Sequence, residues 1–136
     1  MDKGKAFELL VSKSLVKNNF GFLRLYDGRS VGRPMAVSQP ADFIIFAPMP
    51  GFVETKDLSK DRIGIGDFRP AQIKGFFMAQ KHKVGYAVIA RLNGEKYDFP
   101  MYRLLEAASR NKSLTVDKMI PLKGDYFSKV LIDALK

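Results

Sequence analysis

Ionisable side chains interrupt two neighbouring apolar segments, and their types suit phosphate chemistry. Asp42 directly precedes the hydrophobic run Phe-Ile-Ile-Phe-Ala, while Glu54 and Lys56 lie inside the next apolar segment. Charges in such patterns are costly, which marks them as candidates for function. Because side chains alternate along a strand, Glu54 and Lys56 share one face, while Val53 and Thr55 share the other.

A turn between the two segments would bring the acids together. The sequence Pro-Met-Pro-Gly at 48–51 predicts a hairpin between strands at 41–47 and 52–57. Folding that hairpin places Asp42 beside Glu54. Two carboxylates on adjacent strands suit Mg²⁺, which takes one or two carboxylates together with water and phosphate oxygens. Lys56 could then orient an attacking water or offset charge on the phosphorane. The alternative is an ordinary surface salt bridge, since Glu-x-Lys is a short motif.

Two further polar residues lie within apolar helical stripes. Glu8 belongs to a helix predicted over 3–18, and Gln72 to a helix predicted over 68–82. Each has a plain structural explanation as well: Glu8 as an acid near a helix N-terminus, and Gln72 as a residue at the helix boundary.

The remaining elements must position these side chains. The pattern predicts a strand at 20–26, a long loop at 27–40, a polar stretch at 58–67, a central strand at 84–92 and a weak strand at 95–99, followed by helices near 101–110 and 125–135. This order predicts an α/β fold: a single domain over 1–136, with a central mixed β-sheet flanked by helices on both faces. Four aromatic residues are expected in the core: Phe43, Phe46, Phe76 and Phe77.

Composition narrows the function. The 136 residues have 23 Lys+Arg against 14 Asp+Glu, a formal net charge of +9, which favours polyanions as partners. The absence of cysteine excludes disulfides, a cysteine nucleophile and thiolate zinc sites, and His82 is the single histidine. No apolar stretch is long enough to span a bilayer and no signal sequence is recognised, so we expect a cytoplasmic protein without membrane partners.

The order of the polar residues resembles that of the PD-(D/E)xK nuclease superfamily. Glu8 lies on a first helix, Asp42 precedes a hydrophobic strand, Glu54-Thr55-Lys56 follow, and Gln72 lies on the next helix. Within the superfamily, the chain looks most like Holliday junction resolvases of RecU and archaeal Hjc type. The likeness includes the opening Gly-Lys-Ala-Phe-Glu at 4–8, Arg24 before the loop, the segments 63–72 and 83–91, and covers about residues 3–100.

The sequence departs from the family at two positions. One additional residue, Ala41, separates Pro40 from Asp42 where the family has Pro-Asp. Ala71 stands where RecU proteins have a histidine before the glutamine.

The resemblance implies a Mg²⁺-dependent endonuclease, with Mn²⁺ as a substitute ion, that resolves four-way DNA junctions as a homodimer. Its catalytic residues would be Asp42, Glu54, Lys56, Gln72 and Glu8, and its metal ligands Glu8, Asp42, Glu54 and Thr55. Lys56 would position the nucleophilic water, and Gln72 would support it or contact phosphate. The small size is phage-like, in which case the enzyme would work in the cytoplasm of the host cell.

Basic residues flank the predicted site in sequence. We expect phosphate contacts from Arg24, Arg29, Arg33, Lys60, Arg62, Arg69 and Lys74, although solvated surface charge explains any one of them equally well. Two other functions remain open: a nuclease of the same superfamily that acts on ends, nicks or flaps, and a non-catalytic basic domain that binds nucleic acid.

Overall fold

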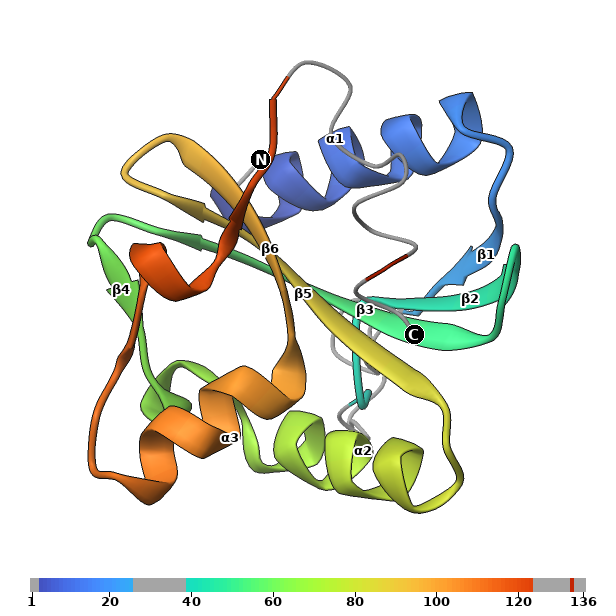
Figure 1. Cartoon of the computed structure of the whole chain (residues 1–136). Coiled ribbons are helices and arrows are strands. Elements are labelled where there is room, and N and C mark those ends of the chain that lie inside the picture. The colour runs from blue at the N-terminus through green and yellow to red at the C-terminus, as the bar shows by residue number, and fades with distance from the viewer. Residues whose placement is uncertain (1–2, 26–38, 124–132, 134–136) are drawn as a thin grey trace, which may run out of the picture.

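Six strands form one mixed sheet in the order β1-β2-β3-β5-β6-β8, and helices cover both of its faces (Figure 1). The computed structural model describes residues 3–25, 39–123 and 133. The main elements are α1 (Lys3–Lys17), β1 (Gly21–Arg24), β2 (Phe43–Ala47), β3 (Gly51–Leu58), α2 (Pro70–Lys81), β5 (Gly85–Leu92), β6 (Glu95–Pro100), α3 (Met101–Ser109) and β8 (Ile120–Pro121). Only β3 and β5 pair in parallel, so the predicted α/β fold with a mixed central sheet is confirmed.

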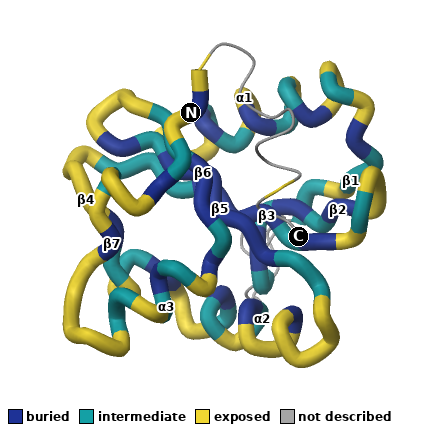
Figure 2. Tube along the Cα trace, in the orientation of Figure 1, coloured by how far each residue is buried: buried dark blue, intermediate teal, exposed yellow. Residues whose placement is uncertain are grey.

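The central strand β5 separates two cores. Ala87 and Ile89 point toward α1, where they pack in one cluster with Phe7, Val11 and Leu15. The alternate residues of β5 face α2 and α3 and pack with side chains such as Phe76 and Leu104. Because β5 lies between two layers of helices, five consecutive residues, Tyr86 to Ala90, are buried. Figure 2 shows this burial in the middle of the sheet.

The hairpin of β2 and β3 has the register that places the acids together. Phe43 pairs with Val53 and Ile44 with Phe52, in an antiparallel ladder. Continuing that register by one residue sets Asp42 opposite Glu54. The Leu25 amide donates to the Asp42 main-chain oxygen at 2.7 Å, which ties the start of β2 to the end of β1 as well. The predicted approach of Asp42 to Glu54 is therefore a direct result of strand pairing.

Several sequence-based boundaries and burial assignments need correction. β2 begins at Phe43 rather than at 41, and α2 runs from Pro70 to Lys81 rather than over 68–82. Phe46 and Phe77 are not core residues: their exposed fractions are 56% and 52%. Phe46 lies on the face of β2 opposite the buried Phe43 and Ile45, and Phe77 lies beside the buried Phe76 on the outer side of α2.

The polar stretch after β3 contains structure that the sequence did not predict. It forms β4 (Arg62–Ile63) and a short 3₁₀ helix, η1 (Ile65–Asp67). β4 pairs with β7 (Leu114–Thr115) in a separate two-stranded sheet, and β7 leads into a second 3₁₀ helix, η2 (Val116–Lys118). The predicted helix at 125–135 lies outside the described residues except for position 133, as does most of the loop predicted at 27–40. In the part that the structure describes, no helix has the length and apolar composition to cross a membrane.

Candidate active site

Glu54 and Gln72 form the buried centre of the site. Their exposed fractions are 2% and 1%, and the Gln72 side-chain amide donates to Oε2 of Glu54. The Gln72 carbonyl oxygen accepts hydrogen bonds from the Arg69 amide at 2.9 Å and from Lys56 Nζ at 3.2 Å. Gln72 is the third residue of α2, and its bond to the Arg69 amide caps the start of that helix. One side chain therefore links the helix terminus to both predicted catalytic residues of β3.

Lys56 lies on the same face of β3 as Glu54, as strand alternation predicts. Its Nζ is 3.3 Å from Glu54 Oε2 and 4.7 Å from the centre of the Phe68 ring. With an exposed side-chain fraction of only 15%, Lys56 is held between the carboxylate, the amide and the aromatic face. These contacts restrict the ammonium group to one position beside the acids.

Asp42 lies just before β2, where the strand register sets it beside Glu54 of β3. Its Oδ2 accepts hydrogen bonds from the Thr55 amide at 2.9 Å and from the Thr55 hydroxyl at 2.7 Å. Thr55, which was predicted as a metal ligand, acts in this structure as a donor that orients Asp42. Its role as a ligand stays a prediction.

Glu8 reaches the same site from α1. Its Oε2 lies 3.5 Å from Arg24, and its carboxyl group also interacts with that of Asp42. Burial, followed by the negative charge of Asp42, raises the pKa of Glu8 to about 7 despite the opposing effect of Arg24. Burial and the Asp42 charge likewise raise the pKa of Glu54, although Lys56 opposes that shift. Asp42 is thus adjacent to both glutamates, and the carboxylates repel one another.

The donors fit a divalent cation held by two carboxylates. Oε1 of Glu54 is buried and has no hydrogen-bond partner, while Oε2 is used by Gln72 and Lys56. A cation would satisfy that oxygen and relieve the repulsion between Glu54 and Asp42. Among the described residues, no group of three or more His, Asp or Glu side chains is arranged to hold a metal ion. The geometry therefore fits Mg²⁺ bound by Asp42 and Glu54 with water or substrate oxygens, whereas Glu8 as a direct ligand stays a prediction.

The residues predicted to contact phosphate differ in where they lie. Four of them are exposed on the segment from the end of β3 into α2: Lys60, Arg62, Arg69 and Lys74. Lys60 contacts Asp67 at 2.7 Å, so part of its charge is offset, whereas the 4.0 Å approach of Arg62 to Asp61 is loose. Arg24 faces Glu8 in the site itself. Arg29 and Arg33 lie outside the described residues.

The sequence did not reveal two residues that contact the segment before Asp42, Tyr86 and Gly75. Tyr86 of β5 is buried, and its hydroxyl donates to the Pro40 main-chain oxygen at 2.5 Å. Burial and the nearby charges of Glu54 and Asp42 raise the pKa of Tyr86, which keeps the hydroxyl protonated as a donor. Gly75 of α2 packs against Pro40. The only sequence signal for either was a polar hydroxyl and a glycine inside otherwise regular elements.

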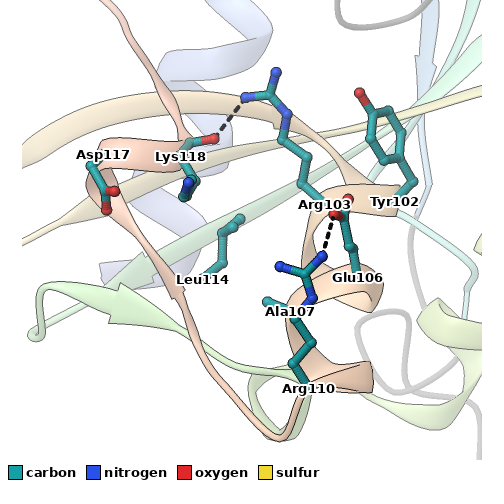
Figure 3. A pocket seen from close by; sticks show the side chains of 8 residues that line it. All are labelled: Tyr102, Arg103, Glu106, Ala107, Arg110, Leu114, Asp117 and Lys118. Atoms are coloured by element: carbon teal, nitrogen blue, oxygen red, sulfur yellow. Dashed lines mark hydrogen bonds and ion pairs between the residues drawn. The ribbon is translucent and has the colours of Figure 1, made fainter.

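A hollow of about 370 Å³ lies apart from these acids, between α3 and the segment 114–118 (Figure 3). Arg103 reaches the main-chain oxygen of Lys118 at 2.7 Å, and Arg110 pairs with Glu106 at 3.4 Å. None of the predicted site residues lines this hollow, and its cations are interspersed with Glu106 and Asp117. The hollow is therefore separate from the carboxylate site, and its lining carries charges of both signs.

Comparison with known proteins gives a structural match but no sequence match. No model of a protein family and no curated protein sequence matches this chain. The structure is similar to that of Archaeoglobus fulgidus Hjc, a Holliday junction resolvase from an archaeal hyperthermophile. The TM-score is 0.55 and the sequence identity 16%, over 90% of this chain and 91% of that protein. The chain therefore has the fold of this Hjc protein over nearly its whole length.

Proposed function

We propose that the protein is a Mg²⁺-dependent DNA endonuclease that resolves four-way junctions by phosphodiester hydrolysis, with Mn²⁺ able to replace Mg²⁺. The observation that carries the proposal is the convergence of Asp42, Glu54, Lys56 and Gln72, with one oxygen of Glu54 left without a partner. The fold shared with Archaeoglobus fulgidus Hjc, a Holliday junction resolvase, supports the same assignment.

Each residue has a role that follows from its contacts. Asp42 and Glu54 would hold the cation, which when bound supplies positive charge to the scissile phosphate as negative charge develops there. The Lys56 ammonium would orient the attacking water and stabilise the added charge of the transition state. Gln72 fixes the side chains of Lys56 and Glu54 relative to each other through hydrogen bonds to both. As the water oxygen bonds to phosphorus, one ester P–O bond breaks. The proton of the attacking water passes to solvent, and the departing oxygen takes up a proton from solvent, so the products are a phosphomonoester and an alcohol.

Exposed cations near this site would position the duplex. The segment from the end of β3 into α2, the helix that bears Gln72, carries four exposed cations: Lys60, Arg62, Arg69 and Lys74. Phosphate contacts on this segment would direct the DNA backbone toward the acids. Such contacts position DNA without reading its bases.

Junction resolution further requires two active sites, because two opposite strands must be cut. A two-fold homodimer matches the symmetry of a four-way junction and supplies both sites. We therefore propose a homodimer that works in the cytoplasm, of its own cell or of a phage host. Sedimentation of the free protein at micromolar concentration should give twice the 15.3 kDa chain mass.

A cleavage assay on three labelled substrates tests the proposal. A four-way junction, a flap and a linear duplex are each incubated with the protein in Mg²⁺ and in EDTA. Symmetric paired nicks in the junction alone, in Mg²⁺ alone, are the expected result. Cleavage of all three substrates would instead indicate a nuclease of broader specificity, and binding without cleavage would indicate a non-catalytic DNA-binding domain.

A further inference from the structure

Asp42 depends on a short segment that has no place in the sheet. Residues 39–42 lead into β2, and Asp42 itself is only half-buried. Its carboxylate is oriented from one side by Thr55, but the main chain before it must also be held. Pro40, two residues upstream, is where that main chain meets α2 and β5.

Gly75 lets α2 approach Pro40 more closely than any other residue would. A Cβ at position 75 would lie 2.4 Å from Pro40 Cβ, 3.1 Å from Pro40 Cα and 3.2 Å from Pro40 O. Carbon atoms in contact are normally about 3.5 Å apart or more. Glycine is unfavourable in the interior of a helix, so its presence at this contact has a steric reason.

Tyr86 holds Pro40 from the sheet side. Its hydroxyl donates to the Pro40 main-chain oxygen at 2.5 Å. The ring is fixed between Phe52 and Phe76, each with its ring centre 6.0 Å away, and only 4% of the residue is exposed. Ala41, between Pro40 and Asp42, is also buried. The segment is thus held by a close helix contact and by a hydrogen bond from a rigid ring.

We propose that Gly75 and Tyr86 are positioning residues that hold Pro40 and thereby fix the Asp42 carboxylate beside Glu54. The consequence for cation binding rests on the proposed function of Asp42. The consequence for the position of Asp42 does not, so the two can be tested separately.

Amide hydrogen exchange measures the position of Asp42 without metal or DNA. The Thr55 amide donates to the Asp42 carboxylate and the Leu25 amide to its main-chain oxygen. In Tyr86→Phe and Gly75→Ala, protection of these two amides should fall by roughly tenfold, as expected when one hydrogen bond is weakened. The amides at the centre of β5 should keep their protection. Unchanged protection of Thr55 and Leu25 in both variants would overturn the proposal.

Cation affinity and the rate of junction cleavage measure the functional effect of the position of Asp42. Calorimetric titration of the DNA-free protein with Mg²⁺ or Mn²⁺ should show weaker binding in both variants. The kcat for junction cleavage should fall by about 10- to 100-fold, as for small misplacements of catalytic groups, with KM for DNA unchanged. Gly66→Ala and Tyr97→Phe are matched controls, because a Cβ at Gly66 meets nothing within 4 Å and Tyr97 is a half-buried tyrosine of β6. Both controls should behave as wild type.

A compensating change tests the steric part. Pro40→Gly removes the Cβ that the new methyl group would strike, so Gly75→Ala with Pro40→Gly should recover part of the lost cation affinity. Lost amide protection with wild-type cation binding and cleavage would support the positioning of Asp42 by Gly75 and Tyr86 and would overturn its consequence for cation binding. A wild-type protein that neither binds the cation nor cleaves DNA would instead refute the proposed function, and the exchange data would still decide whether Gly75 and Tyr86 hold Asp42.

Discussion

At the scale of single residues, Gln72 organises the site. Its amide nitrogen donates to Glu54, and its carbonyl oxygen accepts from Lys56 and from the main-chain amide of Arg69, the residue just before α2. Because both ends of the side chain are used, Gln72 is fully buried without an unsatisfied polar group. Glu54 retains one buried oxygen without a partner, which is the position where a cation is expected.

The crowded carboxyls predict a pH-dependent stability in the absence of metal. Glu8 has a pKa of about 7 in the folded protein, above that of the unfolded chain. Between about pH 5 and 7 the folded protein keeps a proton that the unfolded chain releases. In EDTA, the free energy of unfolding should therefore fall as pH rises. The slope for this group should be smaller than the limit of about 1.4 kcal/mol per pH unit for one proton, because Glu8 is partly exposed and solvent screens its interactions.

Urea denaturation at several pH values measures this slope. Glu8→Gln should reduce it, because the substituted side chain does not titrate. Glu106→Gln, at an exposed site on α3, should leave it unchanged. An identical slope in wild type and Glu8→Gln would show that Glu8 does not titrate as described.

The approach of Asp42 to Glu54 could be predicted from sequence because hairpin register follows from strand alternation and loop length. The contact of Gln72 with Glu54 and Lys56 was suggested by the place of this polar residue in the apolar stripe of its helix. The role of Tyr86 and Gly75 could not be predicted, because it depends on how α2 and β5 meet a segment outside the sheet. No local pattern contains that information.

At the scale of elements, an ion pair between two strands of the sheet also contacts α1. Arg91 of β5 contacts Asp57 of β3 at 2.5 Å and 3.1 Å, and its guanidinium lies 4.8 Å from the centre of the Phe7 ring. Lys3 at the start of α1 approaches the same carboxylate at 3.6 Å. Since α1 also bears Glu8, this contact holds a predicted site residue in place.

Breaking the pair from one side should be costly. The Asp57 side chain is fully buried, so Arg91→Met should lower the free energy of unfolding, by about 2 kcal/mol because Lys3 still approaches the carboxylate. The double variant Asp57→Leu with Arg91→Met should lose less than Arg91→Met alone, since it leaves no buried carboxylate without its arginine partner. Chemical denaturation of the single and double variants measures both. Additive losses would show that the two side chains do not interact.

Helices and strands with clear periodicity could be predicted, and those without could not. α1 and β5 follow from the 3.6-residue stripe and from a continuous apolar run. β4 and β7 have two residues each, too few for any period to be recognised. Phe46 and Phe77 were predicted in the core because they are aromatic residues inside a strand and a helix, but alternation in β2 and the helical turn of α2 direct them outward.

At the scale of the whole molecule, a net charge of +9 accompanies a site built from acidic residues. A bound cation would prevent Asp42 and Glu54 from repelling a phosphate backbone. The exposed cations on 60–74 would then supply the attraction.

Binding to DNA should accordingly weaken steeply with salt. Each phosphate contact contributes about 0.9 log units of affinity per log unit of salt. Arg62→Gln should lower the slope by about 0.9, whereas Lys13→Gln, at an exposed position of α1, should leave it unchanged while altering net charge equally. Fluorescence anisotropy with labelled junction in EDTA measures both slopes. A flat salt response of the wild type would rule out the polyanion interaction.

We propose that Asp42, Glu54 and Lys56 form a cation-dependent site for phosphodiester hydrolysis. The most direct test is the initial rate of junction cleavage in Mg²⁺ for wild type, Lys56→Ala and the control Lys13→Ala, purified in the same way. This proposal predicts that the rate falls by about 10²- to 10³-fold in Lys56→Ala, with junction binding still measurable in EDTA, and that the control cleaves at the wild-type rate. Cleavage by Lys56→Ala at the wild-type rate would contradict it.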